Sequence, residues 1–171
     1  MESIMTTTVD LYLTNSRLRA EIPMLAFTRL SDVLNNIPGM FLHAALLGTG
    51  DASSGGALAA DGLKRDFVVR LQDLLFVCPL ADGTSGPPPS SAERRDRLQQ
   101  RMVLQLDGWR ISGSLHLVDH VRWVDFATSV NTRFIAVTEA VIGPPGGAEP
   151  IVCPFLLVNG ARLSAIYEQA A

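Results

Sequence analysis

The sequence has few charged residues for its length. Charged residues make up 18% of the 171 residues and hydrophobic residues 47%, and the net charge at pH 7 is -3. Soluble domains carry about 25% charged residues, so this chain has ample material for a core and little solvating charge. That balance favours a protein that buries apolar surface against a partner or against another copy of itself.

A basic surface, which non-specific nucleic-acid binders use to hold phosphates, is also missing. The densest basic cluster is interleaved with two acids and consists of Glu93, Arg94, Arg95, Asp96, Arg97 and Arg101. Mixed signs of this kind are typical of the solvated face of a short helix. Nucleic acid is therefore a possible but disfavoured partner.

Cysteine is scarce, and no apolar run is long. Cys78 and Cys153 lack CxxC spacing and lie in apolar stretches, so we expect two buried free thiols, as in a reducing cytoplasm. The apolar run at residues 151–158 contains Pro154 and is far shorter than the ~20 residues of a membrane-spanning helix. The first residues lack the basic and apolar regions of a signal peptide. We expect a cytoplasmic protein with no membrane span.

Motifs for catalysis and cofactor binding are absent too. The sequence holds no GxSxG, no P-loop and no GxGxxG after a strand. The one metal-like cluster is His116, Asp119 and His120. It straddles the end of a strand and a turn, where residues i and i+4 lie ~13 Å apart if extended. We expect no catalytic, cofactor-binding or metal site, no cofactor and no enzyme activity.

An internal repeat is present. An offset of 93 residues aligns 9–47 with the second half without a gap, and an offset of 89 resumes the register after a shorter loop. The identities at offset 93 are Leu11/Leu104, Leu13/Leu106, Arg17/Arg110, Arg29/Arg122, Asp32/Asp125 and Phe41/Phe134. Apolar positions coincide between them, and Val69/Val158, Leu74/Leu163 and Val77/Ile166 follow at offset 89. The pattern predicts two copies of one β-rich unit.

Each unit has the same predicted order of elements. Alternating residues 9–14 predict a strand, and a tight turn leads to a second strand at 17–24. The corresponding turn in the second unit is Asp107-Gly108, a strong hairpin signal. A short helix at 29–36, a third strand and a final hairpin complete the unit. In the second copy of this helix we expect Trp123 and Phe126 to be buried.

The predicted boundaries are 1–80 for the first repeat, 81–101 for a linker and 102–171 for the second repeat. The linker contains three successive prolines at 87–89, which form a stiff polyproline spacer. Ser90 and Glu93 make a capping box, so we expect a short helix over 90–101.

The second half resembles Sm-like RNA-binding proteins. Gly108, Gly113, an apolar residue and Asp119 are similar to the first motif of that family, and residues 158–166 are similar to the second. The resemblance implies a five-stranded, SH3-like small barrel or strongly bent sheet, duplicated in tandem. It also implies a candidate RNA-type loop of Trp109, Arg110, Asp119, Asn159 and Gly160. The stretch 29–35 resembles a group of short uncharacterised bacterial proteins, which implies no activity.

Three functional hypotheses remain open. The first is a non-enzymatic binding or assembly protein, a structural or accessory subunit that contacts a protein partner or forms a homo-oligomer. The alternative is an Sm-like RNA-binding protein, which needs a basic surface with aromatic side chains free to stack on bases. The third is an enzyme whose site no motif reveals.

Overall fold

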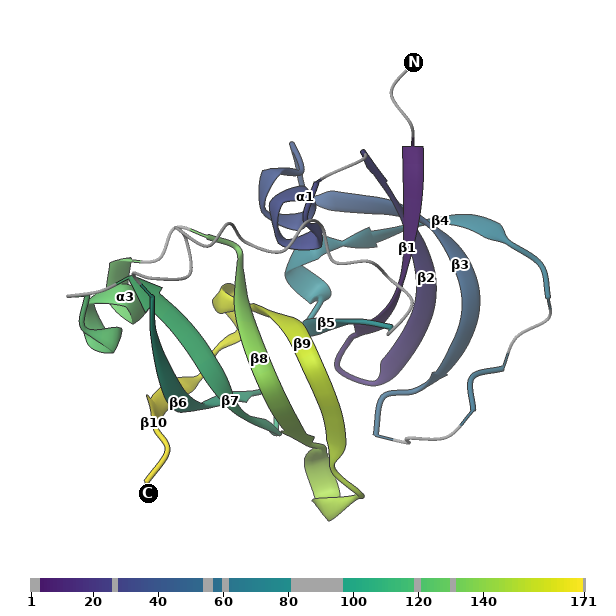
Figure 1. The fold of residues 1–171 in the computed structure, drawn as a ribbon. Coiled ribbons are helices and arrows are strands. Elements are labelled where there is room, and N and C mark those ends of the chain that lie inside the picture. Colours follow the sequence, from purple (N-terminus) through teal and green to yellow (C-terminus); the bar gives the residue numbers. More distant parts are fainter. Residues whose placement is uncertain are drawn as a thin grey trace.

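The computed structural model describes residues 4–25, 28–53, 57–59, 62–80, 97–118, 121–129 and 132–170. Among these residues the fold is mainly β: ten strands form one open antiparallel sheet, and two short α-helices pack beside it (Figure 1). None of the helices in the described part is long and apolar enough to cross a membrane.

The first half follows the predicted order of two strands, a helix and three further strands. Its elements are β1 (Ile4–Tyr12), β2 (Ser16–Leu25), α1 (Leu30–Asn36), β3 (Phe41–Asp51), β4 (Arg65–Arg70), the 3-10 turn η1 (Leu71–Asp73) and β5 (Phe76–Pro79). In α1 the residues four apart, Leu30 and Leu34, are the buried ones, as the helical period requires.

The second half repeats that order. Its elements are β6 (Arg97–Leu106), β7 (Trp109–Val118), α3 (Trp123–Ser129), β8 (Phe134–Gly143), η2 (Pro145–Gly147), β9 (Ile151–Asn159), η3 (Gly160–Arg162) and β10 (Ala165–Glu168). Asp107 and Gly108 both have positive φ between β6 and β7, which is the backbone of a tight two-residue hairpin. The Asp-Gly hairpin prediction is confirmed.

Strand order and register recur between the halves. The sheet runs β10-β6-β7-β8-β9-β5-β1-β2-β3-β4, so each half has its fifth strand beside its first. The pairing of Val9 with Ala20 in β1–β2 recurs as Met102 with Gly113 in β6–β7, at an offset of 93. Opposed residues in the other strand pairs of the first half also correspond to opposed residues in the second half. These are Arg19–Gly48 and Ser112–Val141, Phe41–Arg70 and Phe134–Asn159, and Val9–Pro79 and Met102–Glu168.

The predicted helix over 90–101 is wrong at its C-terminal end. Residues 97–101 belong to β6, where Arg97 opposes Val118 and Arg101 opposes Ser114 in β7. A long partner strand supplies a hydrogen-bonded ladder that outweighs the local helical signal. Residues 90–96 and the prolines at 87–89 lie outside the described residues. Strand β6 therefore begins at residue 97, inside the segment predicted as a linker.

Burial in α3 also differs from expectation. Trp123 and Phe126 contact the core of the second half but are only partly buried, and α3 has no fully buried residue. Helix α1 is more buried than α3, because α1 packs against its own half and also against β8 of the other half.

Two apolar cores lie side by side and exchange side chains. Tyr12, Phe76 and Cys78 come from the first half but pack in the core built mostly by the second. Conversely, Phe134 and Leu157 come from the second half and pack in the core of the first. The exchange takes place where β5 pairs with β9, so the halves share an interior along that junction.

Candidate functional site

Trp109, the aromatic residue of the predicted RNA-type loop, is a core residue. It is 1% exposed, and its ring meets the rings of Tyr12 and Phe76 edge-on at 5.7 and 5.1 Å between centroids. Tyr12 and Phe76 are themselves stacked at 4.4 Å. Such contacts are typical of a packed aromatic core. A ring held in this way has no face available to a nucleic-acid base.

Asn159 is fully buried and serves the backbone around it. Its side-chain amide donates to the carbonyls of Leu71 at 3.1 Å and Leu74 at 2.8 Å, and its Oδ1 accepts from the backbone N–H of Ala161 at 3.1 Å. The first two bonds cross from the second half to the first. Asn159 therefore holds η1, which leads into β5, against the end of β9.

The remaining residues of that loop are spread over the second half. Arg110 is exposed on β7, opposite Gln105 and Gly143, and the backbone N–H of Gly160 donates to the carbonyl of Arg133 at 2.9 Å. Asp119 lies outside the described residues. Among the described residues of the predicted loop, the one aromatic ring, that of Trp109, is buried.

Replacing Asn159 with alanine should lower the free energy of unfolding by about 2 kcal/mol, because two carbonyls and one N–H lose a buried partner. Urea unfolding followed by circular dichroism measures the change. Asn36→Ala is the matched control, since within the described residues that exposed amide donates to the carbonyl of Asp32 in its own helix alone. Equal small losses in the two variants would contradict the role given to Asn159.

Tyr12 has a raised pKa and lies at the junction of the two cores. Burial raises the pKa of Tyr12 to about 12, although a hydrogen bond from Arg17 favours the ionised form. An unfolded chain ionises its tyrosines near pH 10, so the neutral Tyr12 stabilises the fold fully below that pH. This contribution is lost as the pH rises from about 10 through 12.

Tyr12→Phe should therefore be less sensitive to alkali than the unaltered chain. We expect the difference in unfolding midpoint between the two proteins to change as the pH is raised from 9 to 11, in favour of the phenylalanine variant. Urea titrations at several pH values measure it. A difference that stays constant over this range would show that Tyr12 ionises as freely in the folded chain as in the unfolded one.

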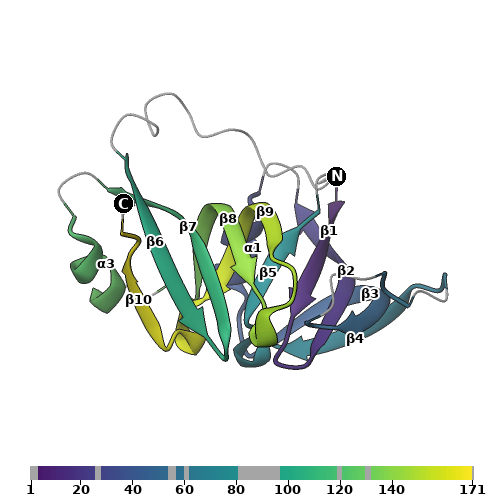
Figure 2. The ribbon, with the colours of Figure 1, turned by 90° about the horizontal axis from the view of Figure 1, so that it is seen from below.

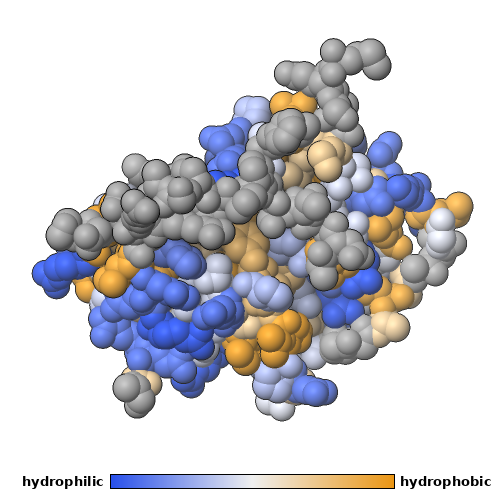
Figure 3. Space-filling view, in the orientation of Figure 1, coloured by the Kyte–Doolittle hydropathy of each residue, from blue (hydrophilic) through white to orange (hydrophobic). Residues whose placement is uncertain are grey.

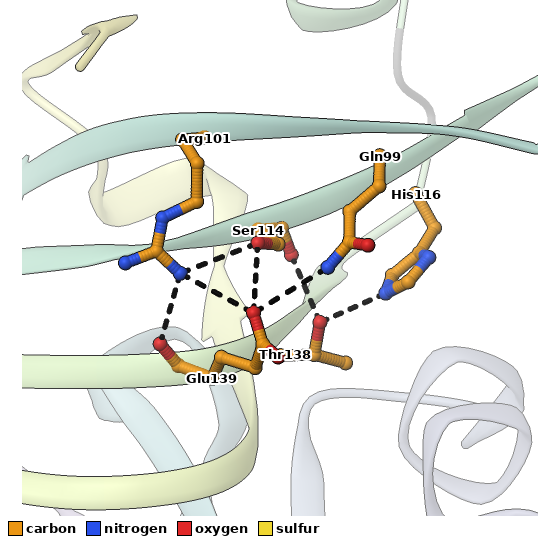
Figure 4. Close-up of polar contacts among 6 residues, drawn as sticks. All are labelled: Gln99, Arg101, Ser114, His116, Thr138 and Glu139. Atoms are coloured by element: carbon orange, nitrogen blue, oxygen red, sulfur yellow. Dashed lines mark hydrogen bonds and ion pairs between the residues drawn. The ribbon is translucent and has the colours of Figure 1, made fainter. Parts of the chain in front are cut away.

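A polar cluster unique to the second half lies on β6, β7 and β8 (Figure 4). Arg101 of β6 contacts the carboxylate of Glu139 at 3.4 Å and the hydroxyl of Ser114 at 3.4 Å. Ser114 and Gln99 also reach that carboxylate, each at 3.5 Å, while His116 contacts Thr138 at 2.8 Å. The positions 93 residues earlier are Thr6, Thr8, Glu21, Pro23, Ala45 and Leu46.

The cluster sits at a β-bulge. The register between β7 and β8 shifts between Ser112 and Ser114, and Glu139 has a φ of 50°, which is uncommon outside glycine. The ion pair is exposed, and its carboxylate is already shared among three donors. His116 contacts the threonine, not the serine, so the geometry supplies no serine–histidine pair of the kind that activates a nucleophile. The contacts of the cluster join β6, β7 and β8 around the bulge.

The two ends of the sheet offer a different kind of site. In the described part of the chain β4 pairs with β3 alone and β10 with β6 alone, so each presents an open edge. Apolar side chains lie exposed at the β4 end, where Met40 and Val68 are each 61% exposed and Phe41 is 48% exposed. Figure 3 shows apolar surface among polar residues on the side of the molecule where β3 and β4 lie. Open edges with apolar flanks are templates for a further strand.

No protein-family model, curated protein or solved structure matches the chain. Within the described ranges no group of three or more histidine, cysteine, aspartate or glutamate side chains is placed to hold a metal ion. Of the metal-like cluster, Asp119 and His120 lie outside those ranges. Cys78 and Cys153 are free and buried, as expected from their apolar surroundings.

Proposed function

We propose that this protein is a non-enzymatic assembly protein that binds protein chains by strand addition at the open edges of its sheet. The observation that carries the proposal is the β4 edge. Among the described residues β4 pairs with β3 alone, and Val68 of β4 and Phe41 of β3 are 61% and 48% exposed. In strand addition the backbone supplies affinity and the flanking side chains supply specificity.

We also propose that the two halves are tandem copies of a small five-stranded unit of the Sm-like or SH3-like kind. The support is the recurrence of strand order and of the strand pairings at offsets of 93 and 89 residues. Fusing two such units places one junction within a single chain. The two strand edges that do not take part in this junction are the β4 edge and the β10 edge, at the two ends of the sheet.

The test compares two exposed valines. Val68 on the β4 edge and Val118 on β7 are each 61% exposed, so lysine at either position disturbs the fold little. A protein partner recovered from the cells that make this chain should be retained by Val118→Lys and lost by Val68→Lys, because a charge at the edge opposes strand addition. Equal retention by both variants contradicts the proposal.

Nucleic-acid binding is expected to be weak and without sequence preference, because the net charge is -3 and Trp109 is buried. Fluorescence anisotropy with labelled single-stranded RNA, measured over a range of salt concentrations, checks this. Sequence-specific binding at physiological salt with a steep salt dependence would favour the Sm-like RNA-binding alternative.

A further inference from the structure

The junction between the two halves joins strands that occupy different positions in their repeats. The fourth strand of the second half, β9, pairs with the fifth strand of the first half, β5, through Leu157 opposite Val77 and Val158 opposite Phe76. The backbone N–H of Asn159 adds a bond to the carbonyl of Leu75 at 2.9 Å. A fourth-strand edge therefore meets a fifth-strand edge, which makes the junction head-to-tail.

Helix α1 completes this junction. The side chain of Asn35 donates to the carbonyl of Phe134 at 3.1 Å and accepts from its N–H at 2.7 Å, which ties α1 to the start of β8. The side chains of Phe134 and Leu157, 2% and 0% exposed, fill the core of the first half. The first half thus packs its helix α1 against β8 and pairs its fifth strand, β5, with the edge of β9.

The corresponding surfaces are more exposed at the two ends of the molecule, although the guanidinium of Arg70 lies 5.6 Å from the centroid of the Phe41 ring. Phe41 and Val68 occupy the positions of Phe134 and Leu157 in the first half, and they are 48% and 61% exposed. At the other end, α3 has no buried residue where α1 buries Leu30 and Leu34. Figure 2 places α3 and β10 at one end of the sheet and β4 at the other.

We propose that the occupant of the β4 edge is the β10 edge of a second copy of this chain. This inference rests on the proposed function, whose partner it names. Transferred by the repeat offsets, the internal pairing predicts Val68 opposite Ile166 and Val69 opposite Ala165 of the next copy. The helix α3 of that copy then lies against the start of β3 at Phe41, as α1 lies against the start of β8 at Phe134. The pairing ends before Asp66 and Glu168, whose like charges would otherwise face each other.

A head-to-tail contact does not terminate in a dimer. Each copy keeps one free β4 edge and one free β10 edge until the assembly closes, so copies add into rings or open chains. The internal β5–β9 junction acts as the model for every external one. A symmetric dimer through two β4 edges would use different contacts and would leave both β10 edges free.

Sedimentation of the full chain over a range of concentrations is the first measurement. We expect species heavier than the 18.4 kDa monomer for the unaltered chain and for Val118→Lys. Val68→Lys and Ala165→Lys should each raise the dissociation constant at least about tenfold, because each puts an unpaired charge into the contact. Phe41→Ser, on the half-exposed neighbour of the edge, serves as a second variant at the β4 end. Circular dichroism confirms that each variant is folded.

Mixing the two blocked variants tests the direction of the contact. Val68→Lys retains a working β10 edge and Ala165→Lys a working β4 edge, so an equimolar mixture should give a one-to-one pair of twice the chain mass. Neither variant should form that pair alone. Self-association of Ala165→Lys by itself would show a symmetric β4 contact and overturn the inference.

The two proposals fail in distinguishable ways. A chain that stays monomeric at every concentration overturns self-assembly, while edge-dependent capture of a different protein would still support strand addition. Self-assembly that Val68→Lys leaves unchanged overturns the inference as well, because the contact then lies elsewhere.

Discussion

Replacing Trp109 with alanine should lower the free energy of unfolding by about 3–5 kcal/mol, the range for deleting a fully buried aromatic side chain. Trp109 of β7 packs edge-on against Tyr12 of β1 and Phe76 of β5, so its ring joins the two halves at their shared interior. The loss adds the burial free energy of the removed ring atoms to the cost of the cavity left between three strands. Trp109 is the largest fully buried side chain in the described part of the chain, so its truncation should leave the widest cavity.

Two further variants separate size from polarity at this position. The indole N–H of Trp109 has no hydrogen-bond partner among the described residues, so Trp109→Phe removes an unsatisfied buried donor and keeps an aromatic ring. We expect it to cost much less than the alanine variant. Trp123→Ala is the control, because Trp123 is only partly buried in α3. Urea unfolding measured by circular dichroism compares all three, and a loss below about 1 kcal/mol for Trp109→Ala would mean that the halves do not depend on this ring.

Replacing Gly113 with alanine should cost about 3 kcal/mol, at the upper end of the range for overpacking a filled interior. A Cβ at this position would lie 2.5 Å from Cγ1 of Val137 and 3.0 Å from the carbonyl oxygen of Thr138. The valine is fully buried, and the threonine carbonyl belongs to β8 beside the bulge. The carbonyl moves only with its strand, and Val137 would have to turn within a filled core, so the added methyl group strains the sheet.

Gly143→Ala provides the matched control in the same sheet. A Cβ there would lie 3.4 Å from the carbonyl oxygen of Arg110, an ordinary contact, so the variant should unfold within about 0.5 kcal/mol of the unaltered chain. The first half carries Ala20 at the position of Gly113, fully buried beside its own bulge. Thermal unfolding of the two glycine variants decides the point, and equal midpoints would mean that β8 yields to the added methyl group.

Much of the local structure was predictable from residue patterns. Alternation at residues 9–13 identifies the face of β1 that carries Val9 and Leu11, both fully buried, and the Asp107-Gly108 pair identifies the hairpin between β6 and β7. The resemblance to Sm-like proteins placed Asn159 and Trp109 in a candidate binding loop, and both side chains are buried in the structure. Both side chains contact partners from the first half, which no pattern within the second half could reveal.

The sequence alone determined the order of elements and the mainly β class, because alternation, turn residues and helical spacing act over a few neighbouring positions. The tertiary structure decided the rest. Residues 97–101 became part of β6 because β7 offered them a continuous ladder, and Leu157 and Phe134 entered the core of the other half because β9 pairs with β5. Pairing between strands so distant along the chain depends on which edges meet when both halves are folded. Local sequence patterns cannot predict this pairing, because its free energy comes from burying apolar side chains between the two halves.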